Sequence, residues 1–262
     1  MEMIFIFLVT FVAAIDQFNF LESLYQPIVM GPLVGAILGN VEVGLVVGGT
    51  YQLMTIGNMP VGGAQPPNAV IGGVVATIFA VKANLEPAQA VGLAVPFALI
   101  GQMMVTLIFT LMSPLMKVAD DAATNANPKG IRNLNFLAMV LLGTAFGIVA
   151  VLALSAGSAF GAQIESFFEK FAWIKTGLEV GGGMLRYVGF AILMKIMLSG
   201  ELWGYYFAGF AAATIIGAIP GLGGSTILLV AIIGMAIALA DYQTNIKLKS
   251  SGSTFGGESD GI

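Results

Sequence analysis

The chain has 262 residues, of which 58% are hydrophobic and only 9% are charged, with a formal net charge of −4. A soluble domain of ordinary composition carries about 25% charged residues, so this deficit excludes a soluble core and indicates a polytopic membrane protein, while the negative charge argues against nucleic-acid binding. The sequence holds no cysteine and no histidine, which excludes disulfides, thiolate metal sites, a phosphohistidine or phosphocysteine, and imidazole acid–base catalysis.

Apolar runs between the charged residues predict the helices in chain order. The expected segments are 3–15, 28–40, 41–57, 69–82, 86–116, 136–154, 178–200, 202–219 and 225–240. The first segment lacks a basic region before it and a small-residue cleavage site after it, so we expect a retained membrane helix or amphipathic anchor rather than a signal peptide. The polar patch that follows contains Asp16, Gln17 and Asn19, a weaker site candidate for which we favour a position at the membrane interface.

Polar segments divide the rest of the chain. Residues 117–133 predict an aqueous loop, and residues 165–177 predict an amphipathic helix at the interface because phenylalanines and a tryptophan alternate with charged residues there. We expect a single membrane-embedded domain over 1–240 and a disordered polar tail over 241–262. The predicted fold class is all-α: a bundle of transmembrane helices with discontinuous or re-entrant segments.

The discontinuous segments are predicted from their length. Segments 28–40 and 69–82 have too few residues to cross about 30 Å of hydrocarbon at about 1.5 Å per residue. Between them lies "GNMPVGGAQPPNAVIGG" (57–73), which combines prolines, glycines and amides without any charge. Irregular backbone survives inside a membrane only where it is buried in protein or lines a cavity, and interrupted helices in transporters point to the binding site.

These residue types predict a site for a neutral polyhydroxy ligand. Side-chain amides offer paired donors and acceptors for hydroxyl groups, glycines allow close backbone approach, and the tandem prolines fix the loop and open the following helix. The predicted binding residues are Gln52, Asn58, Gly62, Gly63, Gln65, Pro66, Pro67 and Asn68. The alternative interpretation is a tight helix-packing site, since small residues are common at such contacts.

A second candidate region is "EVGGGMLRYVGFAILMKIM" (179–197). Its triple glycine lies beside Glu179, and charged residues within apolar segments are functional hypotheses by default. We include Glu179, Gly181 and Gly182 (with Gly183) as further candidates that would close the site as a second re-entrant element. Whether Glu179, Arg186 and Lys195 are functional or interfacial stays open. We find no nucleotide-binding motif and no metal-ligand cluster, so we expect no cofactor.

Two stretches carry a resemblance to a known family. Residues 31–73, "GPLVGAILGNVEVGLVVGGTYQLMTIGNMPVGGAQPPNAVIGG", and residues 179–197 resemble the enzyme IIC subunit of mannose/fructose/sorbose-class sugar phosphotransferase system permeases. The stretch "GGAQPPN" (62–68) is most similar to members that handle N-acetylgalactosamine or galactosamine. Many members have a glutamate where this chain has Gln52, which keeps a hydrogen bond and loses the charge.

The resemblance implies a multi-pass protein of the bacterial inner membrane, in contact with lipid. It implies a larger hetero-oligomer with a IID membrane subunit and several IIC copies, in which the sugar is carried by an elevator-like movement of a core domain. A cytoplasmic IIB subunit, supplied by IIA, would phosphorylate the sugar. Whether this chain counts as an enzyme stays open, because it carries no phosphoryl-accepting histidine or cysteine.

Two other functions stay open from the residues. An ion-coupled secondary sugar transporter would normally need a buried carboxylate in the site, and residues 43–81 contain no charged residue. A non-transporting scaffold or receptor subunit would need no translocated ligand.

Overall fold

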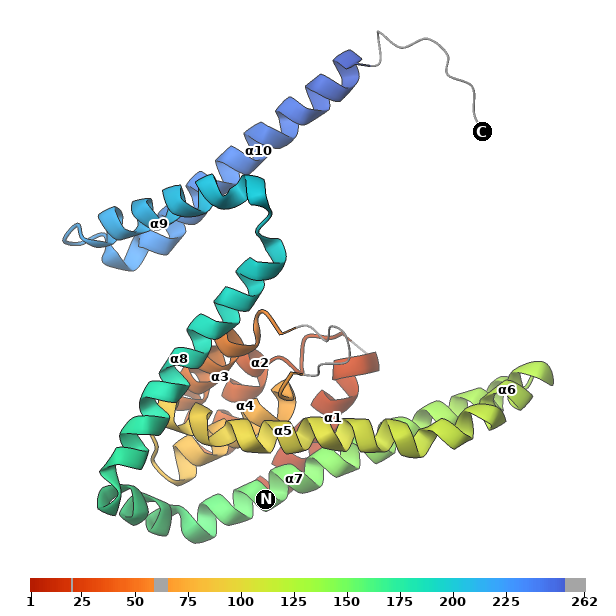
Figure 1. Cartoon of the computed structure of the whole chain (residues 1–262). Helices are drawn as coiled ribbons and strands as arrows, with labels where there is room; N and C mark the ends of the chain where they lie inside the picture. The colour runs from red at the N-terminus through yellow and green to blue at the C-terminus, as the bar shows by residue number, and fades with distance from the viewer. Residues whose placement is uncertain (20, 59–65, 253–262) are drawn as a thin grey trace. The chain divides into compact units, whose positions relative to one another are not determined.

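The computed structural model describes the backbone of residues 1–19, 21–58 and 66–252. The described residues form α-helices and short 3-10 turns and include no strand, which confirms the predicted all-α fold class (Figure 1). The chain divides into two compact units, Met1–Ile196 and Met197–Ile262, and each is considered by itself below.

The helices of the first unit agree with the expected order of segments. They are α1 (Glu2–Asn19), α2 (Pro27–Ile37), α3 (Val41–Thr55), α4 (Ala69–Lys82), α5 (Pro87–Met112), the 3-10 turn η1 (Ser113–Leu115), α6 (Met116–Thr124), α7 (Pro128–Lys170) and α8 (Ala172–Met197).

Helices α2 and α3 form a hairpin whose backbones touch through glycines. A side chain at Gly31 would meet the carbonyl of Gly44, and one at Gly44 would meet the carbonyl of Gly31. Such small residues let helices approach closely without a hydrophobic driving force between them. The connecting turn places Gly39 at φ +84°, and Asn40 then caps α3 by accepting a hydrogen bond from the Val43 N–H at 3.1 Å.

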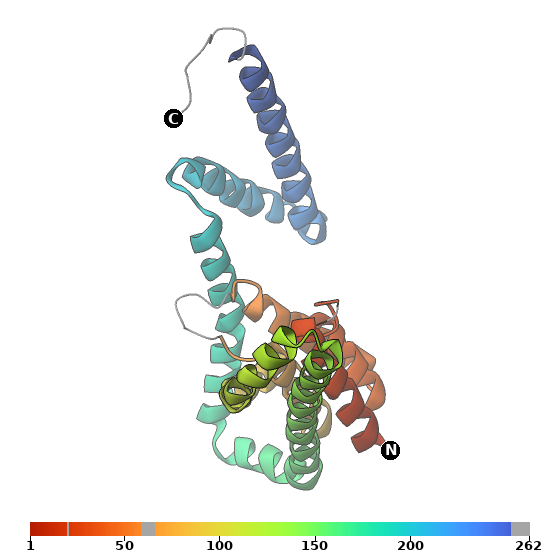
Figure 2. The same ribbon diagram turned by 90° about the vertical axis from the view of Figure 1, so that its right-hand side faces the viewer.

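Helix α4 is the centre of the first unit. It is apolar on all sides, and its buried residues run without interruption from Val70 to Ala80, as expected for a helix enclosed by others. Helices α1–α4 gather beside the α5–α7 pair (Figure 2). Lys82 at the end of α4 forms an ion pair of 2.9 Å with Glu2 at the start of α1, so the two helices run in opposite directions.

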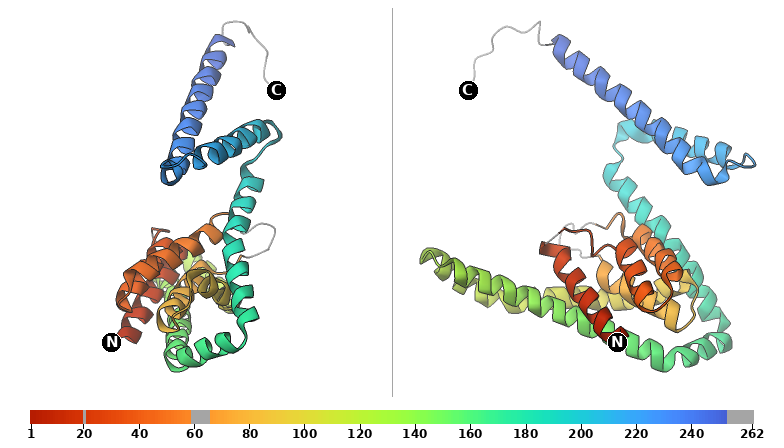
Figure 3. Two further views of the ribbon diagram at one scale, coloured as in Figure 1. Left: turned by 90° about the vertical axis from the view of Figure 1, so that its left-hand side faces the viewer. Right: turned by 180° about the vertical axis from the view of Figure 1, so that it is seen from behind.

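Helices α5 to α7 form a long antiparallel hairpin (Figure 3). The predicted aqueous loop 117–133 is largely helical, because α6 continues the line of α5 and α7 begins directly at Pro128. Pro128 suits the first helical position, and Asn127 caps α7 by accepting from the Gly130 N–H at 3.2 Å. The turn needs only Asn125–Asn127, with Ala126 at φ +47°.

The predicted amphipathic segment 165–177 is divided between two helices. Helix α7 continues to Lys170, the backbone leaves the helical region at Phe171, and α8 begins at Ala172. The Phe167 and Phe171 rings pack with centroids 4.9 Å apart, while the Trp173 side chain is 74% exposed. The aromatic residues therefore surround a bend between two long helices rather than forming a separate helix.

The second unit is a helical hairpin. It comprises the 3-10 turn η2 (Gly200–Leu202), α9 (Trp203–Gly217), the 3-10 turn η3 (Gly223–Ser225) and α10 (Thr226–Gly252). The "PGLGG" break at 220–224 separates the helices as predicted, with Gly221 at φ +88°. Helix α9 has 15 residues, fewer than the predicted segment 202–219, and α10 continues past residue 240 to Gly252. Residues 253–262 lie outside the described part of the chain. The predicted limits, a membrane domain over 1–240 and a tail over 241–262, therefore stay a prediction.

Five described helical segments are long and apolar enough to cross a membrane. They are Glu2–Asn19, Pro87–Thr124, Pro128–Ala159, Ala172–Met197 and Thr226–Lys247. Helices α2, α3 and α4 have 11, 15 and 14 residues. At about 1.5 Å per residue each is shorter than the roughly 30 Å hydrocarbon layer.

Candidate functional site

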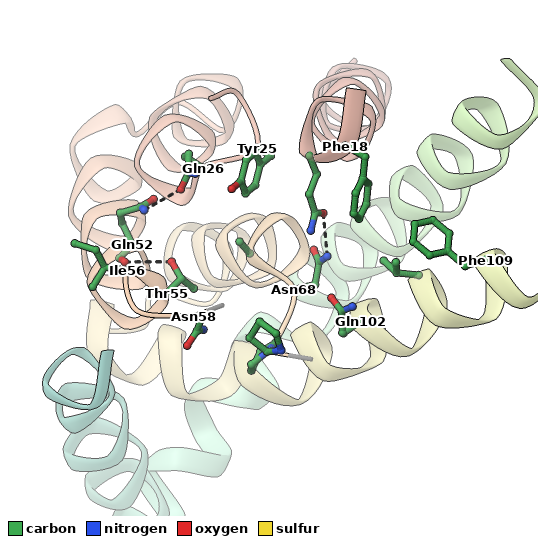
Figure 4. Close-up of a pocket in the computed structure, with 15 residues that line it drawn as sticks. Phe18, Tyr25, Gln26, Gln52, Thr55, Ile56, Asn58, Asn68, Gln102 and Phe109 are labelled. Atoms are coloured by element: carbon green, nitrogen blue, oxygen red, sulfur yellow. Dashed lines mark hydrogen bonds between the residues drawn. The ribbon is translucent and has the colours of Figure 1, made fainter. Parts of the chain in front are cut away.

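The ends of four helices meet around one pocket in the first unit. The carboxyl ends of α1 and α3 and the amino ends of α2 and α4 all supply residues to it, and α5 crosses beside them (Figure 4). The pocket has a volume of about 460 Å³, which is within the usual range for small-molecule sites. It lies where the sequence predicts the interruption between α3 and α4.

Uncharged polar side chains from several helices line the pocket. Six amides contribute, from Gln17, Gln26, Gln52, Asn58, Asn68 and Gln102, together with the hydroxyl groups of Tyr25 and Thr55. None of the lining residues that the structure describes is charged. The pocket can therefore offer several hydrogen-bond donors and acceptors to a neutral ligand but no counter-ion to a charged one.

Gln52 joins α3 to the start of α2. Its Nε2 donates to Oε1 of Gln26 at 2.8 Å, and its Oε1 accepts from the backbone N–H of Ile28 at 3.3 Å. The Ile28 N–H belongs to the first turn of α2, where no intrahelical acceptor exists. Gln52 thus supports the amino end of α2 and also faces the pocket, which gives it a structural role that the sequence did not predict.

Asn68 likewise both supports a helix end and lines the pocket. It is the residue before α4, and its Oδ1 accepts from the Ile71 N–H at 3.1 Å. Its Nδ2 donates to Oε1 of Gln17 at 3.1 Å, and its backbone N–H donates to the Ala98 carbonyl of α5 at 3.0 Å. These bonds fix the entrance of α4 to both α1 and α5, so the Asn68 amide is held in one orientation at the pocket.

The other predicted residues of this loop divide into two groups. Asn58, Pro66 and Pro67 line the pocket, and the Asn58 side chain makes no hydrogen bond to the part of the chain that the structure describes. Gly62, Gly63 and Gln65 lie outside the described residues. Helix α4 begins at Ala69, the first residue of the predicted segment 69–82.

Asp16 organises the segment between α1 and α2. Its side chain is fully buried, and its carboxylate accepts from the backbone N–H groups of Leu21, Ser23 and Tyr25 at 2.8, 2.9 and 3.1 Å. A buried carboxylate with several charge-assisted bonds is a strong local constraint. The sequence did not predict this role, in which Asp16 folds the segment that carries Tyr25 and Gln26 into the pocket.

Three of the lining amides were not predicted as ligands. Gln17 was assigned to the interface, and Gln26 and Gln102 were not singled out. The only signal for Gln102 was an amide within a long apolar segment, which by itself also suits helix packing. Gln102, Val105 and Phe109 have the i, i+3, i+7 spacing of one helix face, and all three line the pocket.

The second candidate region lies elsewhere in the first unit. Helix α8 is continuous through the three glycines, so they form no second re-entrant element. Gly182 packs against the backbone of Ala88 and Gly92 in α5, whereas Gly181 faces open space. Glu179 accepts from Nε2 of Gln89 at 3.4 Å, and neither Glu179 nor Gly181 nor Gly182 lines the pocket.

Two other charged residues belong to this region. Lys195 is exposed in α8, and the side chain of Arg186 lies outside the part that the structure describes. Gln89 is buried, and its Oε1 has no hydrogen-bond partner among the described residues. The contact between α5 and α8 is therefore a close helix crossing that includes the Gln89–Glu179 pair.

The fold and the pocket define a helical, multi-pass membrane protein with an internal polar site, and comparison with known proteins identifies its family. The family model for the sorbose-specific IIC component of the phosphotransferase system matches residues 1–240. The chain therefore belongs to this family of mannose-class IIC sugar permeases. It is 32% identical over 233 residues to N-acetylgalactosamine permease IIC component 1 of Escherichia coli (strain K12), covering 88% of this chain and 84% of that protein.

Two solved structures share the fold. One, described as a membrane protein, superposes with a TM-score of 0.81 at 23% identity and covers 92% of this chain and 95% of its own. The other is the mannose transporter ManYZ in complex with microcin E492, with a TM-score of 0.56, 26% identity, and coverage of 92% of this chain and 94% of that chain.

Proposed function

We propose that this chain is the translocating IIC subunit of a phosphoenolpyruvate-dependent phosphotransferase system that binds a neutral hexose or amino sugar in the pocket between α1, α2, α3, α4 and α5. The observation that carries the proposal is the amide-rich, charge-free lining of this pocket. Sugar hydroxyl groups donate and accept hydrogen bonds in pairs, and amide side chains provide both functions without attracting ions.

N-acetylgalactosamine or galactosamine is the best candidate for the sugar. Two observations support it: the "GGAQPPN" stretch resembles members of that specificity, and the relative in Escherichia coli is named an N-acetylgalactosamine permease. The proposed contacts are Gln52, Asn58, Gln65 and Asn68, with Pro66, Pro67, Gly62 and Gly63 shaping the loop. The separate position of Glu179, Gly181 and Gly182 favours a packing role for these three residues.

Translocation would follow an elevator-like movement of a core domain in the bacterial inner membrane. Short or interrupted helices whose ends meet at a pocket are typical of the binding sites of transporters, and the elevator-like movement is what the family resemblance implies. A IID membrane subunit, several IIC copies and the cytoplasmic IIB and IIA phosphocarriers would complete the complex. The similarity to the ManYZ mannose transporter supports a membrane-embedded complex, and the lack of histidine and cysteine agrees with phosphorylation on another polypeptide.

Uptake of labelled N-acetylgalactosamine tests this function. The chain would be co-expressed with its IIA, IIB and IID subunits in cells that keep a supply of phosphoenolpyruvate. We expect uptake to continue when an ionophore collapses the proton gradient, and the sugar to arrive phosphorylated. Uptake that stops with the gradient and delivers unmodified sugar would instead establish the ion-coupled transporter, and sugar binding without uptake would establish a receptor.

Variants of the loop test the site. Asn68→Ala and Gln65→Ala are expected to abolish uptake while the chain still inserts into the membrane. Asn68→Asp serves as the matched control for the helix start, because aspartate also accepts the hydrogen bond from the first turn of α4. Wild-type uptake in either alanine variant would contradict the site assignment.

A further inference from the structure

A second cavity adjoins the candidate sugar pocket. It has a volume of about 620 Å³ and lies between α1, α5, α6 and α7, with a lining that is mostly apolar apart from Asn19, Ser113 and Asn135. The two cavities share two lining residues, Phe18 and Phe109. These rings therefore stand between a polar space and a largely apolar one.

Along both α1 and α5, the residues that line the sugar pocket give way to residues that line the second cavity at Phe18 and Phe109. On α1, Gln17 lines the sugar pocket, Asn19 lines the second cavity, and Phe18 lines both. On α5, Val105 lines the sugar pocket and Met112 lines the second cavity, with Phe109 lining both. The same boundary on two helices far apart in sequence indicates a partition rather than a chance contact of one side chain.

The two rings touch each other across this boundary. Their centroids are 5.5 Å apart with an interplanar angle of 62°, which is the favoured edge-to-face arrangement of aromatic pairs. The rings are not part of the packed core, since Phe18 is 41% and Phe109 is 53% exposed. In Figure 4 they lie at the opposite end of the pocket from the Gln26–Gln52 pair.

This division matches the two kinds of surface on a pyranose. Hydroxyl groups suit the Gln26–Gln52 end of the pocket (the amide end), while ring C–H groups and an N-acyl methyl suit an apolar aromatic surface. A ligand held by its hydroxyl groups at this amide end would direct its N-acyl group toward Phe18 and Phe109, where the nearby Gln102 amide can face the polar part of that group. A longer substituent in that direction would collide with the rings, although free space lies directly behind them.

We propose that Phe18 and Phe109 form an aromatic wall that limits the size of the apolar substituent that the sugar pocket accepts, and so determine specificity among N-acylated amino sugars. This inference rests on the proposed function, because it requires a sugar in the pocket. Removal of either ring joins the pocket to the second cavity. The enlarged site accepts longer N-acyl groups while the amide end still binds the hydroxyl groups.

Binding of a homologous series to the full-length chain in its permease complex tests the aromatic wall. The probes are N-acetyl-, N-propanoyl- and N-butanoylgalactosamine, with Kd measured for wild type, Phe109→Ala and Phe18→Ala. We expect wild type to prefer the N-acetyl sugar. In both variants the ratio of the N-butanoyl Kd to the N-acetyl Kd should fall by about tenfold or more, the usual effect of one or two methylene groups in an apolar site.

Control variants distinguish failure of the aromatic wall from failure of the proposed function. Phe5→Ala removes a ring that is 50% exposed on α1 but lines neither cavity, and it should leave the ratio unchanged. Phe109→Leu keeps an apolar side chain of intermediate size and should give an intermediate ratio, which keeps the test valid if an alanine variant does not assemble. A wild-type ratio in Phe18→Ala, Phe109→Ala and Phe109→Leu, with N-acetyl binding retained, would overturn the wall alone. Absence of wild-type binding to all three sugars would overturn the proposed function itself.

Discussion

Two regions of the first unit combine glycines with amide side chains, and they differ in what holds them together. Around the pocket, polar side chains satisfy exposed helix ends: Asp16 binds three backbone N–H groups, Gln52 binds one at the start of α2, and Asn68 caps α4. At the crossing of α5 and α8, the backbones touch directly through Gly182, and one polar pair, Gln89–Glu179, lies beside the contact.

The same residue types have two different structural roles inside a membrane protein. Where helices end, orphaned backbone groups need partners, so polar side chains gather and leave space for a ligand. Where helices continue, glycine removes the side chain that would separate them, and the contact leaves no space. Changes in the two regions should therefore affect different measurements.

The largest effect is expected at Asp16. Asp16→Ala removes the acceptor of three backbone hydrogen bonds, and each bond to a charged group contributes about 1.5–3 kcal/mol, so the loss should be about 4.5 kcal/mol or more. We expect a lower thermal midpoint in detergent and loss of sugar binding together. The exposed Asp120 in α6, changed to alanine, is the matched control. Normal sugar affinity in Asp16→Ala would show that the segment 21–26 does not depend on this carboxylate.

A somewhat smaller effect is expected at the helix crossing. Gly182→Val places a side chain against the Ala88 carbonyl, and such overpacking costs about 1–3 kcal/mol. Gly181→Val, one residue away and facing open space, should be close to wild type. Thermal unfolding in detergent measures both variants. Equal destabilisation by the two valines would mean that the glycines serve backbone flexibility rather than close packing.

At the pocket, Asn58→Ala should change binding and leave stability unaltered. Its amide makes no hydrogen bond to the described part of the chain, so the expected loss is that of one bond to the ligand, worth about 0.5–1.5 kcal/mol or roughly a two- to twelvefold rise in Kd. Titration of the purified complex with N-acetylgalactosamine gives the Kd, and thermal unfolding gives the control. An unchanged Kd would remove Asn58 from the site.

The smallest effect is expected from Glu179→Gln. Glutamine can accept the same hydrogen bond from Gln89, and the residue lies away from the pocket, so sugar Kd and uptake should change by less than about twofold. Uptake at equal expression measures the result. A large loss of uptake with normal stability would mean that the charge takes part in transport and that the two regions are coupled.

Much of this architecture could be predicted from local sequence. The helices follow from apolar runs, and the interruption at 57–68 follows from its prolines and glycines, because both depend on neighbouring residues only. Gln52, Asn58 and Asn68 lie in or just before this stretch. They could be predicted as one group because they are close together in the sequence. Gln17, Gln26 and Gln102 could not, because each is a single amide brought to the pocket by a different helix.

The roles of Asp16 and of the α8 glycines could not be predicted from local sequence, and the reason is physical. Asp16 was assigned to the interface because a carboxylate near a helix end usually faces water, and only the folded segment 21–25 shows that it is enclosed by backbone donors. The glycines of α8, with Glu179, were expected to close the site as a second re-entrant element. Instead α8 is continuous through them, and Gly182 packs against the backbone of α5.

The sequence by itself determined that this protein is a helical, multi-pass membrane protein with a charge-free interruption between two short helices, because composition and chain-local sterics decide those features. Tertiary structure alone decided which amides share a pocket, that Glu179 pairs with Gln89 away from it, and that Phe18 and Phe109 divide two cavities. Each of these depends on contacts between helices distant in sequence, and the spacing of residues along the chain carries no information about them.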